Sequence, residues 1–343
     1  MSFRFFRRVR IAPGLGMNFS KTGMSVSLGG SLARFTTGTS GSRFTARPGI
    51  PGLFYTKKLA SPQPRRDGYI ETSGLEGVIS RLNPGFVSGL FLPAEEKAFL
   101  EGLRLLLEGS ESESFEKLLE CYTLPDAAFL LGFLFMKFEN YDDAVKAFLH
   151  ALHRKDELGS LYSRYDVVPT LALPITEQIT AGVQPDARGV LLGLAEVYQL
   201  KGEYEKAIDC LRQLVLTDES DPVAKLSLAE LLVETTAGSK EEMDEVVRLV
   251  GDTENRSDIH AALLLYKGKA LFKLGLYKAS RDTLTAACRR TKNRSEVLLR
   301  TIRFERALAY KALNEGQKAR HELEKLYSED PEFDEVRKLL NFA

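Results

Sequence analysis

The sequence predicts a mainly α-helical protein in which a solenoid of stacked helix pairs follows a small all-β antiparallel domain. Apolar residues alternate with polar ones in short runs over residues 3–57, which is the period of β-strands. From Pro93 onward they recur with the period of α-helices. A fixed spacing of small and large residues also repeats along the helical part, which is typical of a solenoid.

Strands are expected in the front region because its alternating runs are separated by Gly, Ser, Thr or Pro. The tetrapeptide SKTG at 20–23 supplies a turn in which Gly23 can adopt a positive φ without steric cost. Met17 and Phe19 lie on one face before this turn. Further candidate strands of this meander cover residues 3–11, 32–37, 43–47 and 53–57. We assign the β domain to residues 1–58 and a linker to 59–92.

An ordered series of short motifs runs through the front region. It comprises FRF at 3–5, NFSKTG at 18–23, SVSLGG at 25–30 and GIPGLFY at 49–55. With these motifs the region resembles the bacterial domain of unknown function 4236. The resemblance implies a compact β domain and carries no activity.

The helical part, residues 93–343, contains a recurring pattern. Its first clear copy consists of Leu131, Gly132, Phe135, Tyr141, Ala144 and Phe148. Copies that start at residues 125, 188, 222, 261 and 300 are separated by 63, 34, 39 and 39 residues. The pattern resembles tetratricopeptide repeats, which implies about five to six antiparallel helix pairs over residues 94–340.

The first interval is too long for one repeat, so we expect an insertion at about 157–187. Pro169 and Pro174 argue against one continuous helix in this stretch. Its apolar residues also make it unsuitable as a free linker. It forms either an irregular helix pair or a segment that fills the inner groove of the solenoid.

Charge is distributed unevenly along the 343 residues. The formal net charge is zero, but residues 1–66 contain nine Arg and three Lys and no acidic residue, which gives +12. The remainder contains 35 basic and 47 acidic residues, which gives −12. Three cysteines without a CxxC motif suggest neither a disulfide framework nor a zinc ribbon. With no apolar run of the roughly 18 residues that span a membrane, we expect a cytoplasmic protein.

A partner-binding groove is expected on the first helix of each pair, as in the repeats that the sequence resembles. The register predicts a mixed apolar and charged lining for a protein or peptide partner. Its residues are Phe129, Phe133, Leu192, Glu196, Gln199, Leu226, Glu230, Lys269, Phe272, Phe304, Leu308 and Lys311.

A basic surface is expected on the β domain, formed by Arg4, Arg7, Arg8, Arg10, Lys21, Arg34, Arg43 and Arg47. It could bind nucleic acid, bind an anionic membrane surface, or dock on the acidic helical part. Open strand edges could also pair two copies of the chain.

Catalytic chemistry is not indicated by any motif. SKT at 20–22 lacks the preceding glycine and following helix of a phosphate-binding loop. His150 and His153 form a lone H-x-x-H, which is a weak metal motif. We therefore expect a non-enzymatic interaction scaffold without cofactor or metal. The alternative is a nucleic-acid-binding or anionic-surface-binding protein that acts through its basic front domain.

Overall fold

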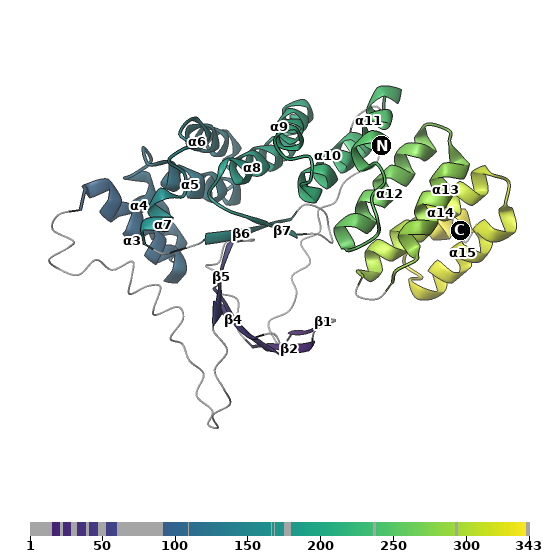
Figure 1. The fold of residues 1–343 in the computed structure, drawn as a ribbon, viewed down its shortest axis with the longest axis horizontal. Coiled ribbons are helices and arrows are strands. Elements are labelled where there is room, and N and C mark those ends of the chain that lie inside the picture. Colours follow the sequence, from purple (N-terminus) through teal and green to yellow (C-terminus); the bar gives the residue numbers. More distant parts are fainter. Residues whose placement is uncertain are drawn as a thin grey trace, which may run out of the picture. The chain divides into compact units, whose positions relative to one another are not determined.

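A computed structural model describes residues 16–20, 23–28, 33–38, 41–46, 53–59, 92–108, 110–165, 167, 169–174, 180–235, 238–291 and 294–340. Its contacts divide the chain into two compact units. Unit 1 is Met1–Pro174 with Thr180–Glu203, and unit 2 is Ile175–Ile179 with Tyr204–Ala343. Figure 1 colours both units along the sequence.

Helical hairpins make up most of the described part of unit 1. In order its helices are α3 (Ala94–Glu108), α4 (Glu111–Leu119), α5 (Pro125–Lys137), α6 (Tyr141–His153), the short α7 (Ser160–Arg164) and α8 (Ala187–Leu200). Helix α3 packs against α4, α5 packs against α6, and α8 packs against both α5 and α6. The second helix of each hairpin also packs against the first helix of the next hairpin, α4 against α5 and α6 against α8, as in a solenoid.

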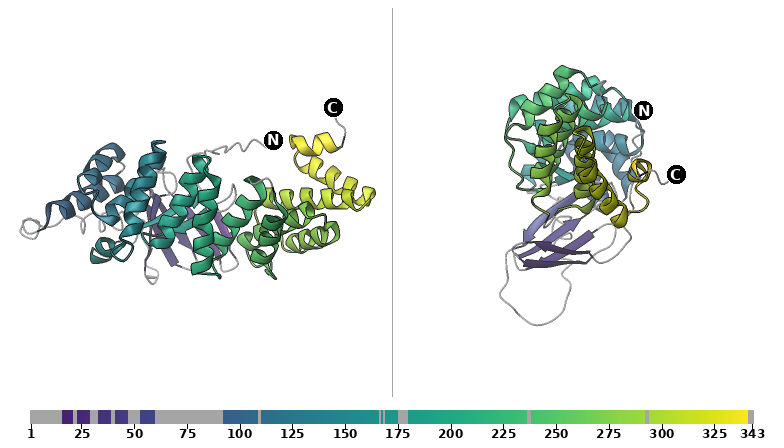
Figure 2. Two further views of the ribbon diagram at one scale, coloured as in Figure 1. Left: turned by 90° about the horizontal axis from the view of Figure 1, so that it is seen from above. Right: turned by 90° about the vertical axis from the view of Figure 1, so that its right-hand side faces the viewer.

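Unit 2 continues the same alternation. Its helices are α9 (Tyr204–Thr217), α10 (Pro222–Thr235), α11 (Lys240–Val250), α12 (Asp258–Lys273), α13 (Tyr277–Cys288), α14 (Glu296–Ala312), α15 (Gly316–Glu329) and α16 (Asp334–Leu339). Neighbouring helices form hairpins, and the first helices α10, α12 and α14 also pack side by side. Figure 2 shows these hairpins from two further sides. The predicted helical solenoid is confirmed. None of the described helices is both long and apolar enough to cross a membrane.

Seven strands pair in sequence order in an antiparallel sheet. They are β1 (Gly16–Ser20), β2 (Gly23–Leu28), β3 (Ala33–Gly38), β4 (Gly41–Ala46), β5 (Leu53–Leu59), β6 (Pro169–Pro174) and β7 (Thr180–Val183). The expected strand at 3–11 lies outside the described residues. Because β6 and β7 come from the helical half of the chain, a separate β domain over 1–58 and a linker over 59–92 stay predictions.

The insertion between α6 and α8 is not an irregular helix pair, so that expectation is wrong. It contains one short helix, α7, followed by the β6–β7 hairpin. Pro169 and Pro174 are the first and last residues of β6, where proline is tolerated because it removes no hydrogen bond from the middle of a ladder. The hairpin belongs to unit 1, where β7 contacts α8 (Figure 1).

Glycine allows the helices of unit 1 to approach one another closely. A Cβ atom on Gly132 of α5 would lie 2.5 Å from Cε1 of Phe148, which belongs to α6. A Cβ atom on Gly193 of α8 would lie 2.7 Å from Cζ of the same ring. Phe148 is fully buried. One aromatic ring therefore joins α5, α6 and α8, and both glycines are required because protein interiors leave no space for an added carbon.

A second close contact recurs in both units. The hydroxyl of Ser114 donates a 2.7 Å hydrogen bond to the carbonyl oxygen of Gly102, and both residues are buried. Ser280 and Gly268 form the same 2.7 Å bond between α13 and α12. Each serine follows its glycine by 12 residues. The pairs α3–α4 and α12–α13 therefore share one packing register, as the repeat pattern predicts.

Replacement of Gly132 by valine should lower the free energy of unfolding by about 1–3 kcal/mol, because the added carbons overlap the Phe148 ring. Urea unfolding followed by circular dichroism measures this change. Gly316→Ala is the matched control, since a Cβ atom there meets nothing within 4 Å. Equal stability of the Gly132 variant and the control would contradict the packing described here.

Candidate functional site

Four of the twelve predicted groove residues lie in the core. Phe129 and Leu226 have no exposed surface, while Leu192 is 2% and Phe133 is 7% exposed. The ring of Phe133 contacts the rings of both Phe129 and Phe148 edge to face. Burial therefore rules out these four side chains as partner contacts in this structure, although their register on the first helices agrees with the pattern.

The insertion contacts the first helices of unit 1 through α7. The Glu96 carboxylate of α3 accepts hydrogen bonds from Nη1 of Arg164 at 2.8 and 3.0 Å and from the Tyr165 hydroxyl at 2.5 Å. Burial, together with the bond to Glu96, raises the pKa of Tyr165 to about 12. The phenol is therefore protonated at neutral pH and acts as a donor.

A second carboxylate holds the beginning of the same segment. Asp126 of α5 accepts backbone N–H bonds from Gly159 at 2.5 Å and from Leu161 at 2.9 Å. The Tyr162 ring packs edge to face on the Phe99 ring, with 5.3 Å between the ring centroids. The start of the insertion therefore packs against α3 and α5 in unit 1, and its place in the inner groove stays a prediction.

A predicted groove residue near the C-terminus is also covered. Phe304 of α14 packs against the cluster of Ala307, Leu323, Leu326 and Val336, together with Phe333. The ring centroids of Phe304 and Phe333 are 5.2 Å apart. Because α16 contributes Val336 to this cluster, the last helix covers the end of the repeat array.

Lys269 of α12 lies between two carboxylates on neighbouring first helices. Its ammonium group forms an ion pair with Glu234 of α10 and lies 3.6 Å from Oε1 of Glu305 on α14. Burial opposes the charged lysine, but the two carboxylates outweigh it and raise the pKa of Lys269. Burial likewise raises the pKa of Glu305 despite the adjacent lysine. The Lys269 side chain therefore forms ion pairs that link α12 to α10 and α14.

The remaining groove candidates are accessible to different degrees. Glu196, Gln199, Glu230, Phe272 and Leu308 are half-buried, whereas Lys311 is exposed. Gln199 donates to the carbonyl oxygen of Ala195 in its own helix at 3.2 Å. We use the name "unit 2 face" for the surface of α10, α12 and α14 formed by Glu230, Glu234, Lys269, Phe272, Glu305, Leu308 and Lys311.

Four acidic residues of these faces are absent from the sequence-based prediction: Glu96, Asp126, Glu234 and Glu305. A signal existed for two of them, because Glu96 and Asp126 each stand six residues before the close-packed glycine of their helix. Their partners lie 68 and 33 residues away in the sequence. The repeat register alone could therefore place the carboxylates of Glu96 and Asp126 on one face. It could not identify their hydrogen-bond partners.

Two predicted basic residues lie on described strands. Arg34 belongs to β3 and Arg43 to β4, and Arg43 pairs in register with Thr36 and Lys58. Cross-strand partners share one face of a sheet. The other six, Arg4, Arg7, Arg8, Arg10, Lys21 and Arg47, lie outside the described residues, so the basic surface stays a prediction.

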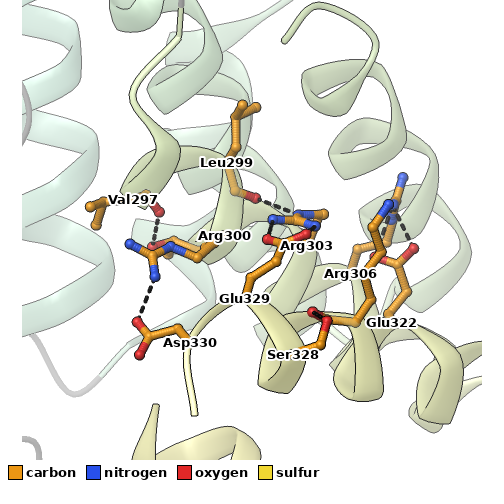
Figure 3. Close-up of polar contacts among 11 residues, drawn as sticks. Val297, Leu299, Arg300, Arg303, Arg306, Glu322, Ser328, Glu329 and Asp330 are labelled. Atoms are coloured by element: carbon orange, nitrogen blue, oxygen red, sulfur yellow. Dashed lines mark hydrogen bonds and ion pairs between the residues drawn. The ribbon is translucent and has the colours of Figure 1, made fainter. Parts of the chain in front are cut away.

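Three arginines of α14 face acidic residues of α15 and the residue that follows it, as Figure 3 shows. Arg300 bonds to Asp330 at 2.6 Å, Arg303 forms a two-pronged pair with Glu329, and Arg306 bonds to both oxygens of Glu322 at 2.9 Å. Each positive charge is thereby neutralised within its own hairpin. This stripe therefore offers no unpaired guanidinium to a polyanion.

The histidines and cysteines have local packing partners. His150 stacks on Tyr122, with 5.1 Å between centroids, and its Nε2 lies 3.0 Å from the carbonyl oxygen of Thr123. Burial raises the pKa of the Cys121 thiol to about 12 and that of Cys210 to about 11. Among the described residues no three His, Cys, Asp or Glu side chains are grouped so as to hold a metal ion.

The stability of unit 2 should depend on pH through His260. Its Nδ1 lies 2.6 Å from the Ser257 hydroxyl, and burial, with Arg256 and Arg294 nearby, lowers its pKa below the ordinary 6.5. The folded chain therefore binds fewer protons than the unfolded chain just below pH 6.5. The free energy of unfolding should consequently fall as the pH drops from 6.5 through the lowered pKa.

Urea unfolding of the wild type and of His260→Gln at several pH values between about 5 and 8 tests this dependence. In the variant, the free energy of unfolding should no longer show the fall below pH 6.5 that is due to His260. His321→Gln, which changes an exposed histidine of α15, is the matched control. Identical profiles for the wild type and His260→Gln would be inconsistent with the assignment.

Two family models match this chain, one in the front region and one in the helical part. Residues 3–56 match the family described as a protein of unknown function, DUF4236. Residues 141–341 match the family described as the N-terminal domain of EccA1, a type VII secretion protein of the ESX-1 system. The predicted combination of this front domain with a tetratricopeptide-type array is confirmed. A search of curated proteins finds no match.

Several solved structures are similar. The N-terminal domain of the EccA1 ATPase from the ESX-1 system of Mycobacterium tuberculosis is 18% identical, with a TM-score of 0.49 over 72% of this chain and 88% of that chain. YrrB, a TPR protein with an unusual peptide-binding site, is 16% identical, with a TM-score of 0.44 over 66% and 97%. A thermophilic TPR protein from Thermus thermophilus, TTC0263, is 18% identical, with a TM-score of 0.38 over 62% and 95%.

The sequence match to the EccA1 family begins at Tyr141, the first residue of α6, and extends through the helices of unit 2. It covers 201 of the 343 residues (141–341), which is more than half of the chain. The chain therefore belongs to the family of the N-terminal domain of the ESX-1 secretion protein EccA1.

Proposed function

We propose that this protein is a non-enzymatic scaffold whose unit 2 face binds a segment of a partner protein. The observation that carries the proposal is the accessibility of this face. It combines the partly exposed Glu234–Lys269–Glu305 cluster with the half-buried Phe272 and Leu308. Apolar side chains beside charged groups suit an amphipathic or extended peptide.

Each part of the unit 2 face has a distinct role in the proposal. Phe272, whose ring lies 5.1 Å from that of Tyr277, supplies apolar contact area together with Leu308. The charged cluster selects partners by charge complementarity, because an incoming charged group would exchange with Glu234 or Lys269. Lys311 extends the charged surface along α14.

Nucleophilic chemistry at Cys121 and Cys210 is disfavoured by the state of their thiols. With a pKa of about 12 for Cys121 and about 11 for Cys210, both are protonated at neutral pH. Nucleophilic cysteine chemistry requires the thiolate. The family is named for a component of the ESX-1 secretion system, so a component of a secretion system is the first partner to test.

The proposal gives the front region a separate role. A basic all-β domain over residues 1–58 would localise or oligomerise the scaffold. The +12 charge of residues 1–66 supports this role and also the alternative, the binding of nucleic acid or an anionic membrane surface. Because Arg300, Arg303 and Arg306 of α14 are already paired with acids, these arginines are poor candidates for binding nucleic acid or anionic lipid. Both activities are therefore assigned to the front region.

The double variant Phe272→Ala/Lys311→Glu should reduce partner recovery at least tenfold, because it removes apolar area and reverses a charge on the unit 2 face. Affinity purification from the source cells with quantitative mass spectrometry measures this recovery. Leu216→Ser is the matched control, since Leu216 is 82% exposed but lies on α9. A partner set that survives the double variant intact would refute this binding site.

If the alternative function is correct, the full chain should slow the electrophoretic migration of labelled DNA or RNA at low salt. Because counterions are released on binding, affinity should fall steeply as salt is raised from about 50 to 200 mM. Arg43→Glu/Lys58→Glu should weaken the shift, since these paired residues add positive charge to β4 and β5. Absence of any shift at low salt would remove nucleic acid as a ligand.

A further inference from the structure

A short segment of the insertion, Gly159–Tyr165, is held on the inner face of α3 and α5 in the way that a peptide ligand is held. Two carboxylates make most of its polar contacts to α3 and α5, and they occupy equivalent positions in successive first helices. The Tyr162 hydroxyl also donates to the main-chain carbonyl oxygen of Asp126 at 3.3 Å. Glu96 lies six residues before Gly102, and Asp126 lies six residues before Gly132. Both carboxylates are buried, with 6% and 1% exposure respectively.

Asp126 recognises the backbone of the segment. Its Oδ1 accepts the N–H of Gly159 at 2.5 Å, and its Oδ2 accepts the N–H of Leu161 at 2.9 Å. The φ of Gly159 is +82°, a left-handed conformation that favours glycine. A ligand at this end of the site therefore needs a glycine two positions before an apolar residue. Its other contacts with the Asp126 carboxylate are made by main-chain N–H groups, which do not depend on side-chain identity.

Glu96 and Phe99 recognise side chains. Glu96 accepts bonds from the Arg164 guanidinium at 2.8 and 3.0 Å and from the Tyr165 hydroxyl at 2.5 Å. The Tyr162 ring, which is 2% exposed, contacts the Phe99 ring. The chemistry of this end therefore selects an aromatic residue two positions before an arginine and three before a tyrosine.

The segment is buried in its middle and more exposed towards both ends. Leu161 and Tyr162 are 7% and 2% exposed, whereas the side chain of Arg164 is 60% exposed. Solvent and competing ligands can reach the ion pair of Arg164 and Glu96, because its guanidinium is exposed although its carboxylate is buried. Exchange can therefore begin at the Arg164 end without prior unfolding of α3 or α5.

We infer that the inner face of α3 and α5 is a peptide-binding site occupied by the chain's own Gly159–Tyr165, and that a partner segment of the form glycine-x-apolar-aromatic-x-Arg-Tyr replaces it. A tethered ligand has a high effective concentration, so the intact chain binds only segments that compete with it. This site lies in unit 1 and is independent of the unit 2 face.

The test uses the full chain and a fluorescein-labelled peptide with the sequence GSLYSRY, residues 159–165. The variant Tyr162→Ala/Arg164→Ala weakens the internal ligand and should bind the peptide at least tenfold more tightly than the wild type, as measured by fluorescence anisotropy. Addition of Glu96→Gln to this variant should weaken binding at least tenfold. A peptide with alanine in place of its arginine should show the same loss.

Several outcomes would overturn the inference. One is a double variant with wild-type circular dichroism that does not bind the peptide, and another is equal binding of the arginine and alanine peptides. Should the double variant lose helical signal, Arg164→Ala alone is used, because Arg164 is mostly exposed. Its hydrogen exchange should rise at residues 159–165 while α3 and α5 stay protected, and unchanged exchange there would also overturn the inference.

The unit 2 variant Phe272→Ala/Lys311→Glu separates this inference from the proposed function. Added to the Tyr162→Ala/Arg164→Ala chain, it should leave peptide affinity unchanged, because neither residue belongs to the α3–α5 face. A loss of peptide binding in that chain would place the peptide on the unit 2 face and contradict the inference.

Discussion

The close approach of paired helices is the constraint on which the structure depends. Gly132 and Gly193 bring α5 and α8 against the Phe148 ring, where an added Cβ atom at either position would overlap the ring. Once the hairpins are packed at this distance, their first helices lie side by side. The side chains on the inner face of those helices are then held at fixed spacings, which is a requirement for any specific site on a solenoid.

The two units use this inner face differently. In unit 1 the insertion covers it, and the carboxylates of Glu96 and Asp126 are satisfied by the chain itself. In unit 2 the corresponding surface carries Lys269 between two carboxylates and stays partly exposed. A surface that is already satisfied internally binds a partner only by exchange, whereas a partly exposed surface can bind one directly.

Several charges of the helical part are paired locally, although residues 67–343 carry a net charge of −12 and residues 1–66 carry +12. Arg300, Arg303 and Arg306 of α14 each pair with one acid, namely Asp330 just after α15, Glu329 at its end and Glu322 in its middle. Half-buried pairs of this kind fix the geometry of a hairpin more than they add stability, since desolvation offsets much of the attraction. The excess of twelve positive charges over residues 1–66 has no acidic residue within the same stretch.

The sequence by itself determined the helical repeat architecture and the register of Gly132 within it, and predicted an insertion after α6. These follow from local periodicity and from spacings that recur within about 40 residues. Only the tertiary structure decided which inner-face residues are accessible. Phe129, Phe133, Leu192 and Leu226 are buried by packing that the register of the first helices does not reveal. The partners of Glu96 and Asp126 lie 68 and 33 residues away, and no local pattern encodes contacts at that separation.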